Sequence, residues 1–266
     1  MDCVTSTTLP EAILALSGWL RLDSYLDALS GAEPTLYNRP MSKRVYKFTK
    51  AQHGISNLRG KVLKLSTIDE LNDPFDLRPI DTTDPRIEQA VNALGVHFRQ
   101  TSAILCFSRN WDNLLLWSHY GDSHAGICLG FDIPDGQGGD SYDTDVLYQP
   151  NVLTIRRLED VNLDLATRLL RTKHESWSYE QEVRMFVGLN DPPDARGLRW
   201  IDFGPTLELK EVIIGAQCTP KDSDAVVEEL IPYGESVKCF WAGMRPDAFL
   251  LVRLDNPPDW QSSGKL

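Results

Sequence analysis

Long apolar runs and an excess of basic residues are both missing from this 266-residue chain. No segment reaches the roughly 18 consecutive apolar residues of a membrane-spanning helix. The N-terminus has no charged segment followed by an apolar core, so we expect no secretory signal. The formal net charge is −11 at pH 7, whereas proteins that bind nucleic acids or membrane surfaces usually present a basic face. We therefore expect a soluble protein that does not bind membranes and is not a general nucleic-acid binder.

Closely spaced cysteines are missing as well. The five cysteines are far apart, odd in number and without a Cys-x-x-Cys pair: Cys3, Cys106, Cys128, Cys218 and Cys239. Disulfide frameworks and zinc sites need cysteines in even numbers or at close spacing. The pattern predicts free thiols in a reducing compartment, and we expect a cytoplasmic protein.

Three common nucleotide-binding and hydrolytic motifs are also absent. The chain contains no phosphate-binding P-loop, no Gly-x-Gly-x-x-Gly turn and no Gly-x-Ser-x-Gly elbow. These absences argue against P-loop kinases, Rossmann enzymes and α/β-hydrolases. We also find no internal repeat.

What is present is an ordinary globular composition, with 42% apolar and 24% charged residues. In residues 9–29, four leucines and Trp19 recur at helical spacing, which predicts an amphipathic helix. Residues 30–43 contain Gly, Pro and Asn and predict a linker. We therefore expect a helical appendage at 1–43 and a single domain at 44–266. The appendage is a candidate surface for a partner or for homo-oligomer formation.

Strand-like segments outnumber helical ones in the predicted domain. Alternating or continuous apolar runs predict strands at 44–49, 61–67, 103–108, 126–133, 146–149, 182–189, 198–204, 209–216, 236–243 and 248–254. Helical periodicity predicts helices at 84–100, 110–121, 157–175 and 222–230. Because strands and helices do not strictly alternate, the pattern favours the α+β class, with small mixed or antiparallel sheets and flanking helices.

The stretch "KHESWSYEQEVRMFV" (173–187) carries the most suggestive acidic pair. If a strand begins by Tyr179, its period of two places Glu180, Glu182 and Arg184 on one face. Two carboxylates so close repel each other and favour a cationic partner such as Arg184. The pair could orient a hydroxyl, act as a base or hold a metal. A solvated ion-pair network is the structural alternative.

A turn at "LNDPFD" (71–76) brings two further carboxylates together. Asp73 and Pro74 predict an Asx-type turn that places Asp76 near Asp73 and directs Phe75 inward. The alternative to a chemical role is that both carboxylates only cap backbone amides.

The stretch "WSHYGDSHAGICLGFD" (117–132) is dense in side chains capable of chemistry. Trp117 and Tyr120 are three residues apart on the expected helix and share a face. His119 points elsewhere, and His124 follows in the connecting loop. Aromatic pairs on a helix are usually core, and a histidine at a helix C-terminus gains from the helix dipole. We weigh an active site evenly against these structural roles.

Five blocks together resemble a bacterial family of unknown function, domain-of-unknown-function family 2971. In chain order they are "VYKF", "LNDPFD", "CFSRNWDNLLLWSHYGDSHAGICLGFD", "VLY" and "KHESWSYEQEVRMF". The resemblance spans about residues 44–215. The family was defined without an assigned activity, so it implies no reaction by itself.

A weaker resemblance is to ADP-ribosyltransferases, which hold NAD in a cleft between two small sheets. It implies a split sheet, with Tyr46 or Lys47 on the first strand at the nicotinamide ribose. It also implies Ser108 as the central serine and Glu182 as the catalytic glutamate, with Glu180 as the first acid of the pair. The sequence departs from the usual pattern at Lys47, where His or Arg is common, and lacks a Ser-Thr-Ser run.

This resemblance implies a nucleotide-type ligand, most of all NAD as a substrate with no metal. Glu182 would stabilise an oxocarbenium-like state and Arg184 would orient it. Tyr120, Trp117 or Phe75 would stack on the nicotinamide ring. Asn72 joins the binding residues, and His119 is expected at the ribose or diphosphate as a further catalytic residue.

The resemblance also implies a toxin or phage-defence role with an unknown macromolecular target. Two other functions remain open. One is a metal-dependent phosphodiesterase or nuclease that would hold Mg²⁺ with Asp73, Asp76, Glu180 and Glu182, with Lys173 nearby. The other is a non-catalytic sensor or interaction protein in which these motifs only maintain the fold.

Overall fold

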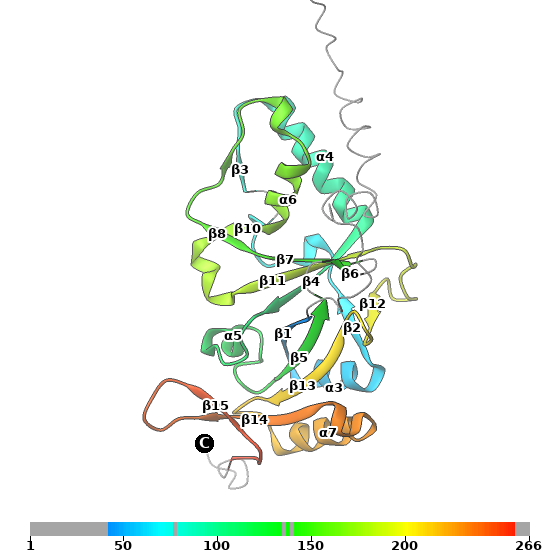
Figure 1. The fold of residues 1–266 in the computed structure, drawn as a ribbon, viewed down its shortest axis with the longest axis vertical. Coiled ribbons are helices and arrows are strands. Elements are labelled where there is room, and N and C mark those ends of the chain that lie inside the picture. The colour runs from blue at the N-terminus through cyan, green and yellow to red at the C-terminus, as the bar shows by residue number, and fades with distance from the viewer. Residues whose placement is uncertain (1–41, 77–78, 135–136, 139–140, 259–266) are drawn as a thin grey trace, which may run out of the picture.

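The computed structural model describes residues 42–258 except 77–78, 135–136 and 139–140 (Figure 1). The helix predicted at 9–29, nearly all of the linker predicted at 30–43 and Cys3 lie outside the described residues. The first described strand begins at Ser42, two residues before the predicted strand at 44–49. The predicted boundary between appendage and domain therefore stays a prediction.

Nine strands of the described chain form one curved main sheet. In sheet order they are β15 (Leu251–Leu254), β14 (Lys238–Met244), β13 (Glu208–Ile214), β5 (Ile127–Pro134), β1 (Ser42–Thr49), β4 (Ser102–Ser108), β11 (Glu182–Gly188), β7 (Ser141–Asp145) and β6 (Gln137–Gly138). All neighbours are antiparallel except β13 and β14, which are parallel.

Small sheets and helices surround the main sheet. The small sheets pair β10 (Thr172–His174) with β8 (Leu147–Gln149), β12 (Arg199–Asp202) with β2 (Val62–Leu65), and β3 (Ile80–Asp81) with β9 (Leu153–Thr154). The α-helices are α3 (Ala51–Gly60), α4 (Pro85–Thr101), α5 (Leu114–His119), α6 (Leu163–Arg171) and α7 (Pro220–Leu230). Short 3₁₀ helices are η1 (Ile68–Glu70), η2 (Leu158–Asp160), η3 (Glu175–Glu180) and η4 (Ile231–Ser236). The predicted α+β class is confirmed.

Several predicted boundaries are wrong for local reasons. The single helix predicted at 157–175 begins only at Leu163, because the Asn162 side chain accepts from the Leu165 amide and caps it. It ends at Arg171, after which 172–174 form a strand paired with β8. The strands β6 and β7 lie within residues 137–145, where the sequence pattern predicts no strand. The ten-residue helix α3 is not among the predicted helices.

The strand predicted to begin by Tyr179 begins instead at Glu182. Residues 175–180 form the 3₁₀ helix η3, and Gln181 adopts a left-handed conformation with φ 43°. Glu180 therefore does not share a strand face with Glu182 through the period of two. It reaches the same region from the end of η3.

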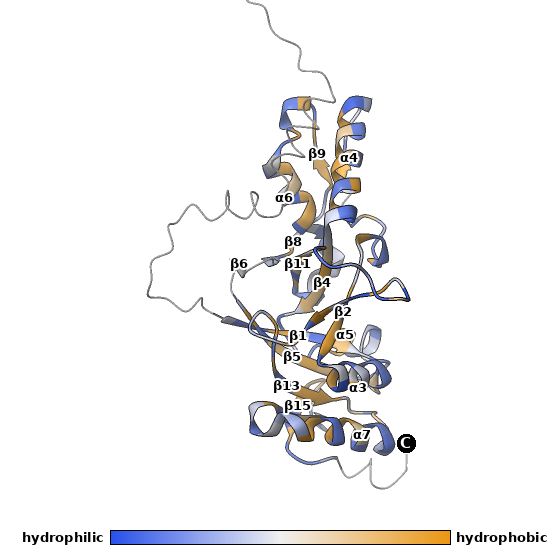
Figure 2. Cartoon of the chain, turned by 90° about the vertical axis from the view of Figure 1, so that its right-hand side faces the viewer, coloured by the Kyte–Doolittle hydropathy of each residue, from blue (hydrophilic) through white to orange (hydrophobic). Residues whose placement is uncertain are grey.

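Opposite faces of the main sheet pack against different helices. One face, which carries Val45 and Leu105, packs against α3, α7 and β2. The other face has two separate apolar clusters, one around α4 and α6 and the other around α5. Figures 1 and 2 show α4 and α6 at one end of the molecule and α7 at the other. The space between the two clusters on the second face is where polar side chains of the sheet gather.

The main sheet opens between β1 and β4. These strands share one registered pair, Tyr46 with Ser108, whereas β1 pairs with β5 over its whole length and β4 pairs with β11 over its whole length. The hydrogen-bonded sheet is therefore continuous, unlike the two small sheets implied by the ADP-ribosyltransferase resemblance. It nevertheless diverges at one point in its centre.

Candidate functional site

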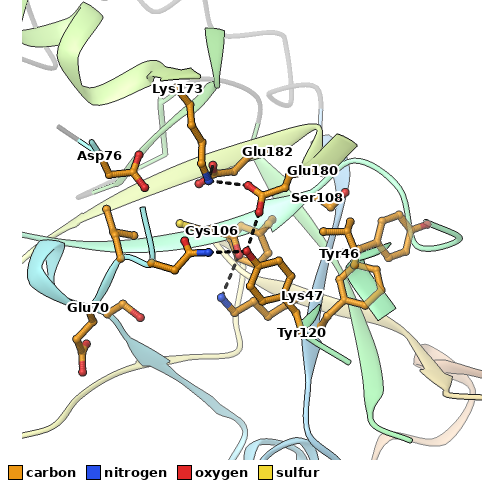
Figure 3. A pocket seen from close by; sticks show the side chains of 16 residues that line it. Tyr46, Lys47, Glu70, Asp76, Cys106, Ser108, Tyr120, Lys173, Glu180 and Glu182 are labelled. Carbon is orange, nitrogen blue, oxygen red and sulfur yellow. Dashed lines mark hydrogen bonds and ion pairs between the residues drawn. The ribbon is translucent and has the colours of Figure 1, made fainter. Parts of the chain in front are cut away.

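A cavity of about 200 Å³ lies where β1 and β4 diverge (Figure 3). Its walls come from both halves of the sheet, from the loop before β3, from α5 and from η3. The residues that line it are Tyr46, Lys47, Phe48, Ser66, Glu70, Leu71, Asn72, Asp76, Cys106, Phe107, Ser108, Leu116, Tyr120, Lys173, Glu180 and Glu182. Seven of the eleven predicted site residues meet here: Tyr46, Lys47, Asn72, Ser108, Tyr120, Glu180 and Glu182.

The register of the strands places a row of paired residues across the main sheet, and Glu182, Ser108 and Tyr46 of this row line the cavity. Glu182 pairs with Ser108, Ser108 with Tyr46, Tyr46 with Gly130, and Gly130 with Glu211. Directly opposite residues in antiparallel strands share a face, so this row crosses five strands on one side of the sheet. A Cβ on Gly130 would lie 3.1 Å from the Tyr46 ring and 3.1 Å from Glu211. Glycine there leaves room for Tyr46 to extend toward Glu211.

One side chain and one neighbouring backbone segment satisfy the backbone of β4 where β1 leaves it. The Lys47 ammonium donates to the Cys106 carbonyl at 3.0 Å, and Ser66 bridges Ile104 through two backbone hydrogen bonds. Polar backbone groups of a sheet edge need such partners when water is excluded. Lys47 is thus held at the opening of the sheet, as predicted for a residue of the first strand beside the cavity.

Five charged residues form a buried group at one end of the cavity, which we call the ion cluster: Asp76, Lys173, Glu180, Glu182 and Arg184. Lys173 Nζ lies 2.6 Å from Glu180 Oε2 and 3.0 Å from Glu182 Oε2. Arg184 Nε lies 2.8 Å from Glu182 Oε1, and its Nη2 lies 2.5 Å from Asp76 Oδ1. The exposed fraction of each residue is 9% or less.

The ion cluster keeps Glu182 ionised. Burial alone would raise the pKa of Glu182, but Arg184 and Lys173 outweigh it and lower that pKa to about 2. The same attractions raise the pKa values of Lys173 and Arg184 against the opposing effect of their burial. At neutral pH the carboxylate of Glu182 and both cations are therefore charged.

Asp76 behaves in the opposite way. Desolvation raises its pKa, and the nearby Arg184 only partly offsets this effect. Its Oδ2 atom is buried without a hydrogen-bond partner among the described residues. Three carboxylates face two cations in the cluster, so one negative charge is left uncompensated when Asp76 is ionised. The cluster can therefore accept one more hydrogen-bond donor or proton at Asp76.

A chain of hydrogen bonds joins α5 to the ion cluster. The Tyr120 hydroxyl donates to Glu180 Oε1 at 2.7 Å and accepts from Asn72 Nδ2 at 2.8 Å. Burial and Glu180 raise the pKa of Tyr120, so the phenol stays protonated. Asn113 fixes the start of α5 by accepting from the Leu115 amide and donating to the Tyr179 carbonyl. The helix and η3 are thereby held together around the cavity.

Four predicted site residues lie elsewhere. Trp117 is fully buried in the core, with its indole N–H donated to the Trp111 carbonyl, so its predicted stacking on a ligand is wrong. Phe75 was expected to point inward but is 61% exposed, because the Asx turn uses Asp73 to bind its amide. His119 is exposed, 6.2 Å from the Tyr179 ring, and does not line the cavity. Arg184 lies behind Glu182 and orients it without facing the cavity.

The carboxylates predicted as Mg²⁺ ligands are arranged for other partners. Asp73 Oδ1 accepts from the Phe75 amide at 2.9 Å, which is the amide-capping alternative. Glu180 and Glu182 are bonded to Lys173, and Glu182 and Asp76 to Arg184. In the described part of the chain, no three His, Cys, Asp or Glu side chains are grouped to hold a metal ion. The ammonium group of Lys173 and the guanidinium group of Arg184 are the partners of the Glu182 carboxylate.

Lys173 has a larger role than its predicted place in a helix, near a metal site, indicates. It lies in β10, is 4% exposed and joins both glutamates. The signal available was a lysine seven and nine residues before two closely spaced glutamates. Cys106, Leu71 and Glu70 also line the cavity and carried no such signal.

Comparison with known proteins finds one family. The family described as "Protein of unknown function (DUF2971)" matches residues 116–185, which confirms the family resemblance over this segment. The segment includes Tyr120, Lys173, Glu180, Glu182 and Arg184, whereas the blocks before residue 116 lie outside the match. No curated protein and no solved structure matches the chain. Among the helices of the described residues, none combines the length and apolar character needed to cross a membrane.

Proposed function

We propose that the cavity at the opening of the sheet binds NAD and that the protein transfers or hydrolyses its ADP-ribose group. The observation that carries this proposal is the polar row across β11, β4 and β1, in which Glu182, Ser108 and Tyr46 are consecutive partners. These are the residues that the ADP-ribosyltransferase resemblance assigns to the glutamate, the central serine and the first strand. They line one cavity although they come from distant parts of the chain.

The charge state of Glu182 supports this chemistry. Cleavage of the nicotinamide–ribose bond builds positive charge on the ribose, and a fixed carboxylate stabilises that charge. A glutamate with a pKa of about 2 is ionised throughout the physiological range. Because Arg184 and Lys173 hold Glu182 in place, little reorganisation is needed as the charge develops.

In the proposed step the bond between C1′ of the ribose and the ring nitrogen of nicotinamide breaks. Its electron pair goes to the nicotinamide nitrogen, which loses its positive charge and leaves as neutral nicotinamide. A water molecule or a nucleophile of the target forms the new bond at C1′ and releases a proton to solvent. No metal or redox partner is required to balance this step.

The unpartnered Asp76 Oδ2 fits a sugar ligand. It is a buried acceptor in the wall of the cavity, and a ribose hydroxyl is a donor of suitable size. A cavity of about 200 Å³ accommodates the nicotinamide end of NAD and not the whole dinucleotide. The remainder of the ligand must extend out of this cavity.

The test is NAD consumption by the purified protein, followed as nicotinamide release by chromatography. Glu182→Gln should lower turnover by about 10²-fold or more, whereas Glu208→Gln, an exposed glutamate on β13, should leave it unchanged. Ser108→Ala is the second variant, since it removes one hydroxyl without altering the ion cluster. Equal consumption by the parent and Glu182→Gln, both shown to be folded, would reject the assignment, as would a parent protein that neither binds nor consumes NAD.

The proposed biological setting follows from the same activity. We expect a cytoplasmic enzyme of the toxin or phage-defence type, because the cysteines of the sequence are suited to a reducing compartment and NAD is abundant there. Its acceptor would be a macromolecular target or water. The appendage predicted at 1–43 is the proposed contact for a partner or second subunit.

A further inference from the structure

A second cavity of about 470 Å³ adjoins the first. Lys173 lines both cavities, and the loop 73–76 contributes Asp76 to the first and its preceding residues to the second. The residues that line the second cavity are Asp73, Pro74, Phe75, Pro79, Gln149, Pro150, Asn151, Val152, Thr172, Lys173, His174 and Trp177. We propose that this second cavity binds the adenine base of a nucleotide ligand, an inference that rests on the proposed function and extends it.

The walls suit a flat apolar ring. Phe75 is 61% exposed and Val152 is 40% exposed, although both are large hydrophobic residues beside a cavity. Trp177 adds a second aromatic side chain, with Lys173 Nζ 4.8 Å from its ring centroid. Stacking of a base on an aromatic side chain strengthens nucleotide binding without needing a charged partner.

Gln149 can form hydrogen bonds with a base bound in the second cavity. Its Nε2 atom is buried without a hydrogen-bond partner among the described residues. The three prolines of the lining have no backbone N–H, so they offer no donors to a ligand. A side-chain amide pairs with a base edge that presents a donor beside an acceptor, and adenine presents such an edge through N6 and N7.

The charge of the cavity favours a base over a phosphate. Lys173, the one lysine in the lining, is already bonded to Glu180 and Glu182, so its charge is compensated within the ion cluster. A phosphate in this cavity would be desolvated, and the lining has no arginine and no lysine other than Lys173 to pair with it. A neutral ring loses little on leaving water and gains the contacts of Phe75 and Trp177.

The probes are adenosine 5′-monophosphate and ribose 5-phosphate, which differ by the base alone. Isothermal titration of the full chain should show binding of the first and at least tenfold weaker binding of the second. Phe75→Ala should weaken the binding of adenosine 5′-monophosphate about tenfold, since it removes a stacking surface. Gln149→Leu, which removes the amide and keeps the size, should weaken it about fivefold or more.

The matched control is Phe249→Ala, because Phe249 is 96% exposed outside both cavities. Its affinity for adenosine 5′-monophosphate should equal that of the parent. Equal affinity for the two probes would overturn the inference, as would full affinity in both Phe75→Ala and Gln149→Leu. Phe75 is exposed, so its variant remains informative if Gln149→Leu does not fold.

The two proposals can fail separately. A parent protein that binds adenosine 5′-monophosphate through Phe75 but does not consume NAD rejects the proposed function and upholds the base site. A parent that consumes NAD in a Glu182-dependent way while Phe75→Ala and Gln149→Leu leave binding of the probe unchanged rejects the base site. Loss of turnover with retained binding of the probe in Glu182→Gln supports both.

Discussion

Two buried carboxylates are bonded to the same guanidinium, but neutralising one should affect the stability of the protein far more than neutralising the other. Glu182 and Asp76 both contact Arg184, at 2.8 Å and 2.5 Å. The pKa of Glu182 is lowered to about 2, whereas desolvation raises that of Asp76. We predict that Glu182→Gln strongly destabilises the protein at pH 7 and that Asp76→Asn does not.

The magnitudes follow from the structure. A pKa displaced from 4.5 to about 2 corresponds to about 3 kcal/mol of stabilisation of the charged form. Removing one partner of a buried ion pair costs about 3–5 kcal/mol, because the remaining charges stay buried. Asp76→Asn instead removes a carboxylate whose charged form is disfavoured by burial, and it keeps an oxygen acceptor for Arg184. We expect it to change the free energy of unfolding by less than about 1 kcal/mol.

The assay is equilibrium unfolding in urea at pH 7, followed by circular dichroism and analysed by linear extrapolation. Glu208→Gln serves as the control, since this exposed side chain should change the free energy by no more than about 0.5 kcal/mol. The reasoning is refuted if Asp76→Asn costs as much as Glu182→Gln. It is also refuted if Glu182→Gln is as stable as the control.

Three further outcomes are expected. Because the folded-state pKa of Glu182 is lowered, its stabilisation of the fold is complete above about pH 4.5 and is lost as the pH falls toward 2. Acid should therefore lower the free energy of unfolding more in the parent than in Glu182→Gln, and urea titrations between these pH values measure the difference. Tyr46→Phe removes a hydroxyl bonded to the paired Glu211 and Arg253 and should lower the urea-derived free energy of unfolding by about 1 kcal/mol. Burial raises the pKa of all four described thiols, and a Cys3→Ser variant contains no other thiol. This variant should react slowly with a thiol reagent at pH 8 when native and rapidly when unfolded. Fast reaction of the native protein would contradict the burial.

The strands were the predictable part of this fold. Apolar runs located β1, β4, β5 and β11 to within two residues at each end, because the main sheet packs against other elements on both faces and its central strands are buried. Strand order and register depend on contacts between distant segments. The sequence alone therefore offered no way to see that Tyr46 pairs with Ser108 and Ser108 with Glu182.

The sequence predicted most residues of the candidate site but not their arrangement in space. Glu180 and Glu182 do lie together, but Lys173 joins them where a strand face was expected to do so. Trp117 fills the core because its large apolar ring gains more from burial than from the cavity. Phe75 is exposed because the Asx turn fixes its backbone through Asp73, a local hydrogen bond that overrides the tendency to bury an aromatic side chain.

Lys173 belongs to the walls of both cavities, and this sharing has a thermodynamic consequence. A ligand that shifts this ammonium group or its carboxylate partners in one cavity changes the field that a ligand meets in the other. If two molecules bind at once, the factor by which the first changes the affinity of the second equals the factor by which the second changes the affinity of the first. Affinities measured for one cavity are therefore defined only when the occupancy of its neighbour is known.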